Sequence, residues 1–263
     1  LLSDIVKSAL QAGADAAEAI SAERQALGIT VRQGKLEEVE REESRDLSLR
    51  VFVGQRHATV SGSDVSPEAR ARLVERAVAM ARLAPEDPYA GLAEASQHAT
   101  DLRPELDLFD PTEPTPEELE TLARRVEAAA LDMPEIRNSD GGSASAARSI
   151  WRLVTSKGFV GAHQASSFSL GASVVAGEGD DMESGYEGRS ARWHSDLPSP
   201  ETLGADAGRR AAARLGARKI ASTTAPVIFE NRLATSLIGP LIGAIGGPSI
   251  ARGSSFLKDK LGQ

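Results

Sequence analysis

The sequence contains no cysteine, few aromatic residues and only four histidines. Without cysteine, this chain cannot form disulfides, thiolate metal sites or a cysteine nucleophile. Aromatic residues make up 4% of the chain, so its core must be mainly aliphatic and alanine-rich. No histidine has a metal-like partner two to four residues away, so we interpret all four as surface or locally hydrogen-bonded residues. They are His57, His98, His163 and His194.

The charge is negative, with 38 acidic residues against 30 basic ones in 263 residues. This balance argues against direct binding of nucleic acid, which a basic surface would favour. The most apolar stretch, 237–250, contains two prolines and is shorter than the roughly 20 residues that a membrane-spanning helix needs. The N-terminus lacks the features of a signal peptide. We therefore expect a cytoplasmic protein with no membrane segment.

Three helices can be predicted from their capping residues. The first would begin at the N-cap Ser3 and end at Gly13. The second would follow Ser66, with a proline in its first turn. The third would follow a capping box formed by Thr115 and Glu118. Each is followed or preceded by strand-like segments, which points to a mixed fold.

Alternation of apolar and polar residues predicts several strands. The pattern indicates an antiparallel meander with one covered face, including a turn at Gln33 and Gly34. The predicted strands cover 28–34, 46–53, 57–63, 148–156, 158–175, 184–194 and a short buried strand at 226–229.

Helices grouped beside strand meanders favour an α+β fold over a doubly wound sheet. The composition becomes rich in serine, glycine and alanine after Pro134. We therefore predict an N-terminal unit over 1–135, with an antiparallel meander and helices. The start of a second, β-rich α+β domain would follow over 136–263.

Three clusters of residues favour structural interpretations over functional ones. The glycines in 239–247 lack the lysine of a phosphate loop and indicate a small-residue helix packed closely against a neighbour. The acidic residues in 178–183 lack a calcium-loop pattern and suggest a solvated turn. A basic helix near 201–215 would align Arg210, Arg214 and Arg218, which we interpret as a solvated face rather than a partner-binding stripe. The residues alone thus indicate no catalytic constellation.

Several ordered stretches nevertheless resemble the TldD/PmbA family, also called the modulator of DNA gyrase family, and its PmbA (TldE) branch in particular. The resemblance runs through nearly the whole chain, and its stretches are GADAAEA, GITVRQGKLEEVE, SGSDVSPEA, PELDLFDPTEPTPEE, NSDGGS, GDDMESGY, SDLPSPETLGADAGRRA and the segment 225–262. The resemblance implies a two-subunit zinc metallopeptidase that processes unfolded peptides. It also implies that the chain is a C-terminally truncated piece of a longer protein.

In the TldD branch, a His-Glu-x-x-x-His helix precedes an Arg-Gly-Thr/Ser-Ser segment and supplies zinc ligands and a base. Aligned on the segment 252–255, these positions fall at about Ile238, Gly239 and Gly243. None of these residues can bind zinc or accept a proton. The resemblance therefore implies a metal-free, non-catalytic partner of a zinc-bearing TldD-type subunit, with an extended peptide as substrate.

Two other functions remain open at this point. The chain could be a non-enzymatic binding protein that modulates DNA gyrase or toxin–antitoxin components, as its acidic first 200 residues suggest. It could also be an independent hydrolase built from carboxylates and serines. Peptide cleavage that survives a chelator would favour the hydrolase.

Overall fold

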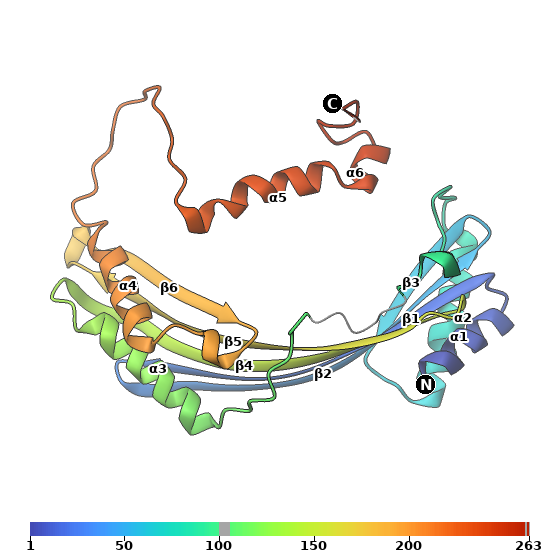
Figure 1. Cartoon of the computed structure of the whole chain (residues 1–263), viewed down its shortest axis with the longest axis horizontal. Helices are drawn as coiled ribbons and strands as arrows, with labels where there is room; N and C mark the ends of the chain where they lie inside the picture. Colours follow the sequence, from blue (N-terminus) through green and yellow to red (C-terminus); the bar gives the residue numbers. More distant parts are fainter. Residues whose placement is uncertain (100–105, 261, 263) are drawn as a thin grey trace. The chain divides into compact units, whose positions relative to one another are not determined.

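The computed structural model describes residues 1–99, 106–260 and 262, which form two compact units. The first unit comprises residues 1–217 and the second 218–263. Each unit is described by itself below (Figure 1).

The first unit is built on one antiparallel sheet of six strands in the order β3-β2-β1-β4-β5-β6. The sheet is long and strongly curved, and its helices lie on the outer side of the curve (Figure 1). Helices beside an antiparallel sheet confirm the predicted α+β class. The strands are β1 (Ala16–Arg32), β2 (Lys35–Val53), β3 (Arg56–Gly62), β4 (Ile136–Thr155), β5 (Val160–Ala176) and β6 (Glu183–Ala191).

The turn between β1 and β2 lies where the sequence predicts it. Gln33 and Gly34 both have positive φ values, of 50° and 70°, as a two-residue hairpin turn requires. The buried carboxylate of Glu127 accepts hydrogen bonds from both turn amides, at 2.7 and 2.8 Å. A side chain from a distant helix therefore fixes the register of this hairpin.

Four helices flank the sheet, and their caps follow the prediction at two of three sites. Ser66 and Thr115 cap their helices through side-chain hydrogen bonds, and Thr115 and Glu118 form the predicted capping box. The prediction of Ser3 as an N-cap is wrong, because the first helix already begins at Leu2. The helices are α1 (Leu2–Gln11), α2 (Pro67–Leu83), α3 (Pro116–Leu131) and α4 (Pro200–Ala212).

Two separate apolar cores lie at the two ends of the sheet. Helices α1 and α2 pack on one end, where Leu47, Leu49 and other strand residues are buried. Helices α3 and α4 pack on the other end, over Ile29 and Leu170. Strand β1 is long enough to serve both cores, with Ala17 in the first and Ile29 in the second.

Strands from both sides of the predicted boundary at 135/136 belong to this one sheet. Strand β1 pairs with β4 from Glu18↔Thr155 to Val31↔Gly142. The boundary is therefore not an edge of the sheet, and the division into 1–135 and 136–263 stays a prediction about sequence organisation.

The second unit contains short helices after an exposed irregular segment. They are the 3-10 turn η4 (Asn231–Leu233), α5 (Thr235–Ala244) and α6 (Gly247–Ala251). The predicted buried strand at 226–229 is wrong, since these residues are exposed and form no strand. Its own unit offers no neighbouring strand within the described residues, so the apolar alternation alone cannot form a ladder. Within the described residues, no helix is both long and apolar enough to cross a bilayer.

Candidate functional site

The middle of the helix-bearing face of the sheet lies between the two cores and carries a mixed polar surface. The strand register places side chains there in rows, because directly paired residues point to the same face. One row runs through Leu27 of β1, which pairs with Arg41 on one side and Ala146 on the other; Ala146 pairs in turn with Phe168. The next row contains Glu43, Gln25, Arg148 and Ser166.

A connecting segment, residues 106–115, crosses this surface and is here called the strap. It is held to β5 by hydrogen bonds to Ser166, a buried residue. The Ser166 amide donates to the carbonyl of Leu108 at 2.9 Å, and the Asp110 amide donates to the Ser166 hydroxyl at 2.9 Å. The Trp193 indole also donates to the Asp107 carbonyl, at 3.0 Å. The strap is therefore tied to β5 and to the segment after β6.

Asp110 is the central anchor of the strap. It is 5% exposed, and its carboxylate accepts hydrogen bonds from the amides of Thr112 and His194, both at 2.8 Å. Hydrogen bonding from Thr112, followed by that from the His194 amide, lowers the pKa of Asp110 below its usual value. At neutral pH the carboxylate therefore works as an ionised structural acceptor.

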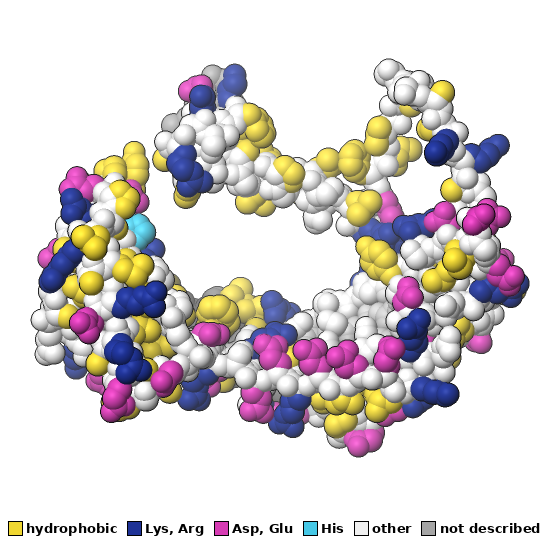
Figure 2. Space-filling view, turned by 180° about the vertical axis from the view of Figure 1, so that it is seen from behind, with side chains coloured by type: hydrophobic (Ala, Val, Ile, Leu, Met, Phe, Trp, Pro, Cys, Tyr) yellow, Lys and Arg dark blue, Asp and Glu magenta, His cyan; other side chains and the backbone are white. Residues whose placement is uncertain are grey.

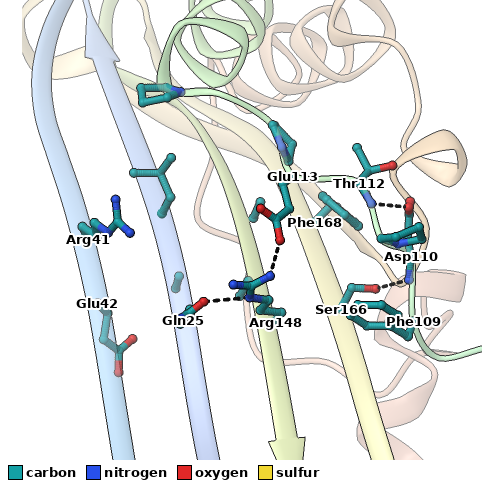
Figure 3. Close-up of a pocket in the computed structure, with 17 residues that line it drawn as sticks. Gln25, Arg41, Glu42, Phe109, Asp110, Thr112, Glu113, Arg148, Ser166 and Phe168 are labelled. Carbon is teal, nitrogen blue, oxygen red and sulfur yellow. Dashed lines mark hydrogen bonds and ion pairs between the residues drawn. The ribbon is translucent and has the colours of Figure 1, made fainter.

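A pocket of about 290 Å³ lies between the strap and the sheet (Figure 3). Leu27, Ala146 and Phe168 form its apolar side, while the strap contributes Phe109 and several prolines. Arg148 points into it from β4 and forms an ion pair with Glu113 of the strap. The pocket thus combines apolar walls with a cationic group, as small-molecule sites commonly do.

A second hollow of about 540 Å³ continues from this pocket toward the α1/α2 end. Its polar wall includes Glu23, which lies 3.7 Å from Arg45 and 2.9 Å from Arg152. Phe109 and Arg148 line both hollows. The two hollows therefore adjoin at these shared residues.

The opposite face of the same strands carries many small side chains, above all on β4 and β5. The α1–α4 helices lie on the other side of the sheet, and this face carries many serines, alanines and glycines (Figure 1). Hydroxyls of facing residues bond across the strands, as between Ser169 and Ser190 at 2.7 Å. The surface includes Ala22, Ala26, Gly28, Ser143, Ser145, Ala147, Ser167, Ser169, Gly171, Ser173 and Ser190.

One edge of the sheet is only partly paired. Strand β3 pairs with β2 only from Leu47 to Val53, so the stretch 35–46 has no further strand beside it within the described residues. This stretch reads KLEEVEREESRD, with six acidic and three basic residues. A row of acidic side chains is visible along the sheet in Figure 2. The free edge therefore offers unpaired backbone groups within a negative field.

The three residues that the resemblance aligns with a zinc motif, Ile238, Gly239 and Gly243, all lie on α5. Ile238 is 56% exposed, and Gly239 and Gly243 are exposed as well. The predicted helix is present at Gly239 and Gly243 but ends at Ala244, and the close packing expected of these two glycines is absent among the described residues. A side chain added at either glycine would meet no atom of the described residues within 4 Å, apart from the local helix backbone.

The segment used to align this motif folds back onto the same helix. The Ser255 hydroxyl is buried and donates to the Ala244 carbonyl at the end of α5, at 2.6 Å. The Arg252–Ser255 segment and the motif positions therefore belong to one local structure. No group of three His, Asp or Glu side chains is placed to hold a metal in the part of the chain that the structure describes.

The four histidines are dispersed, as their spacing predicts. His57 lies 3.7 Å from Asp87, and His98 stacks edge-on against Phe159. His163 lies within β5 rather than at the expected turn, because β5 begins three residues earlier. His194 follows β6 in a 3-10 turn and packs edge-on against Phe168.

The predicted stripe of arginines is wrong, because α4 ends at Ala212 and Arg218 lies outside it. Arg210 instead binds the buried carboxylate of Glu187 on β6 at 2.7 Å. Arg214 donates to the carbonyl of Ser184 at 2.6 Å. These arginines dock the C-terminal half of α4 onto β6 rather than forming a solvated face. Residues 178–182 do form an exposed turn between β5 and β6, as predicted, while Glu183 already begins β6.

Sequence comparison assigns the chain to a peptidase family. Three family models match in order: PmbA/TldA metallopeptidase domain 1 at residues 8–81, the central domain at 109–215 and the C-terminal domain at 222–263. The chain belongs to the PmbA/TldD metallopeptidase family.

Within that family, the chain is similar to proteins named PmbA. It is 39% identical over 267 residues to metalloprotease PmbA of Escherichia coli O157:H7, which covers all of this chain and 59% of that protein. It is 34% identical to a metalloprotease PmbA homolog of Haemophilus influenzae, covering 98% of this chain and 57% of that protein. The chain thus spans a little under three fifths of these relatives.

Solved structures share the fold. A candidate modulator of DNA gyrase from Bacteroides thetaiotaomicron superposes with a TM-score of 0.88 at 23% identity, covering 97% of this chain and 59% of that one. TldE from Thermococcus kodakarensis gives 0.66 at 15% identity over 80% of this chain and 47% of that one. These similarities support the α+β architecture described above.

The pocket under the strap is the part of the site that sequence reasoning missed. Its residues come from β1, β2, β4, β5 and the strap, so no local motif contains them. The one available signal was the proline-rich run before Thr115, which indicated an extended connection but not its position on the sheet.

Proposed function

We propose that this chain is part of the non-catalytic, PmbA/TldE-like subunit of a zinc metallopeptidase complex that processes unfolded peptides. The observation that carries the proposal is that a chain of this family has Ile238, Gly239 and Gly243 where the resemblance places the zinc motif. An isoleucine and two glycines have no ligand atom for zinc and no base for activating water. In this proposal zinc is held by a TldD-type partner, and this chain binds substrate and partner.

The free edge of β2 supports a role in binding an extended peptide. Unpaired backbone amides and carbonyls at a sheet edge can bind a peptide as an added strand without reading most of its side chains. The acidic character of the stretch 35–46 would favour basic peptides and disfavour pairing between copies of the chain. We also propose that the complex acts in the cytoplasm.

Co-purification with metal analysis tests this proposal. We expect the isolated chain to retain no stoichiometric zinc and to cleave no peptide. The complex with a TldD-type subunit should retain zinc and cleave peptide. A variant complex in which the partner's motif glutamate is replaced by glutamine controls for contaminating peptidases.

Three outcomes would contradict the proposal. Stoichiometric zinc in the isolated chain would show that it holds its own metal. Recovery of DNA gyrase or an antitoxin, without any TldD-type protein, would favour the non-enzymatic binding function instead. Peptide cleavage by the isolated chain in the presence of a chelator would point to an independent hydrolase.

A further inference from the structure

We propose that the pocket between the strap and the sheet binds the C-terminal residue of a peptide, with its apolar side chain inside and its free carboxylate on Arg148. This inference rests on the proposed role in peptide processing, from which it takes the peptide as ligand. The pocket itself lies wholly within the first unit, far along the sequence from the zinc-motif positions on α5.

The walls of the pocket suit an aliphatic side chain. Leu27 and Ala146 form a shallow apolar floor, and the Phe168 ring closes one side. Phe109 and the strap prolines complete the lining from the strap. A volume of about 290 Å³ can accept one amino-acid residue but not a folded segment.

The cationic side of the pocket is already arranged for a carboxylate. Arg148 donates to the Gln25 side chain through Nε at 2.7 Å, which fixes the plane of its guanidinium group. Its Nη1 binds the carboxylate of Glu113, whose side chain is 69% exposed. Glu113 therefore occupies the position that a ligand carboxylate would take, and it can leave toward solvent when a ligand arrives. A planar guanidinium binds carboxylates with two parallel hydrogen bonds, which explains the preference for an arginine here.

Among the charged residues that line the pocket, we assign binding of the ligand carboxylate to Arg148 alone. Glu42 pairs with Arg24 at 3.3 Å on the opposite face of the sheet, and Asp110 accepts from backbone amides of its own surroundings. Arg41 stands at the far end of the Leu27 row and pairs with Glu43 at 3.1 Å. The charge of Arg41 is therefore already paired at the pocket, and we do not assign it to a ligand carboxylate.

Binding of N-acetyl-leucine to the whole chain tests the proposal, with N-acetyl-leucinamide and hexanoate as comparison ligands. Titration followed by NMR or by the fluorescence of Trp193, in a Trp151→Phe background, reports on the strap directly. We expect the amide to bind at least about tenfold more weakly than N-acetyl-leucine, because it lacks the carboxylate that Arg148 would bind, and hexanoate to bind more weakly as well.

Three variants sharpen the test. Arg148→Gln should abolish binding, whereas Glu113→Gln should tighten it several-fold by removing the competing carboxylate. Arg152→Gln is the matched control, since Arg152 lies on the same face of β4 and pairs with Glu23 outside the pocket. Circular dichroism would verify that all three variants remain folded.

Each result has a definite meaning. Equal affinity for the acid and its amide, or weaker binding by Glu113→Gln, would overturn the proposal. Equal affinity for hexanoate and N-acetyl-leucine would show that the pocket binds carboxylic acids in general rather than a peptide C-terminus. That result would also overturn the proposal. The assay needs no partner and no zinc, so its failure is distinct from failure of the proposed complex.

Discussion

Glu127 is a buried carboxylate whose two oxygens each accept a backbone amide of the β1–β2 turn. It links α3 to a hairpin that lies about 94 residues away in sequence. A carboxylate is needed because an amide side chain presents only one acceptor oxygen. This single residue therefore joins the third helix to the first hairpin.

We expect Glu127→Gln to lower the free energy of unfolding by about 1–3 kcal/mol, because one turn amide then faces an NH₂ group. Urea denaturation measures the change. Glu120→Gln on the same helix is the control, since its surface pair with Arg124 should contribute only about 0.3–0.5 kcal/mol. Equal effects of the two substitutions would contradict this account.

Gly142 marks the place where β4 and α3 approach most closely. A Cβ at this position would lie 2.3 Å from the Ala123 carbonyl oxygen, a distance that requires the helix to move. We expect Gly142→Ala to destabilise the chain by about 1–3 kcal/mol through overpacking. Gly28→Ala is the control, because its added Cβ would come no nearer than 4.0 Å to Ser145. Thermal unfolding of the two variants measures the difference in stability. A Gly142→Ala variant as stable as the unchanged chain would contradict this prediction.

The strap is the element whose stability depends most clearly on pH. Because hydrogen bonding lowers the pKa of Asp110, its stabilising contribution is present above the usual aspartate pKa and is lost as the pH falls through the lowered value. We expect Asp110→Asn to be less stable than the unchanged chain at neutral pH, with the difference shrinking below about pH 4. Unfolding measured at several pH values tests this sign. A difference that grows on acidification would contradict it.

The elements differ in how far sequence predicts them. The Thr115 capping box and the Gln33–Gly34 turn are confirmed because each depends on residues close together in the chain. The Arg210 stripe and the strand at 226–229 are wrong because both depend on tertiary neighbours: Glu187 attracts Arg210, and no strand accompanies 226–229 in its unit.

The candidate site also contains one part that the sequence predicts and another that depends on tertiary neighbours. The absence of zinc ligands at Ile238, Gly239 and Gly243 can be read from the chain alone, once the resemblance supplies the alignment. The pocket cannot be predicted from the sequence alone, because Gln25, Arg148 and Glu113 become neighbours only through strand pairing and the path of the strap. Periodicity reports which face a side chain occupies but not which distant strand lies beside it.

At the scale of the whole molecule, the two units are joined by an exposed irregular segment, 218–230. Such segments are preferred sites of proteolysis. We expect brief trypsin treatment to cut after Arg218 or Lys219 and to release a fragment close to 1–217 that still unfolds cooperatively. Mass spectrometry identifies the cut, and urea denaturation tests the fragment.

The control for this experiment is the double variant Arg218→Gln, Lys219→Gln, which should remove the cut without changing stability. Arg214 should resist cleavage in the same digest, because it is bound to the Ser184 carbonyl. Loss of cooperative unfolding in the released fragment would show that the second unit is required to hold the first together.

The pairing of β1 with β4 also determines how this chain must fold. Glu18 and Thr155 are partners although 136 residues separate them along the chain, and the two cores share both strands. The hairpin β1–β2 and the hairpin β4–β5 can each form early from local contacts, but their union requires closure of a long loop. Folding rates fall as such distant contacts dominate. Refolding should therefore be slow. It should pass through a stage at which both hairpins have formed but their inner strands, β1 and β4, are not yet paired with each other.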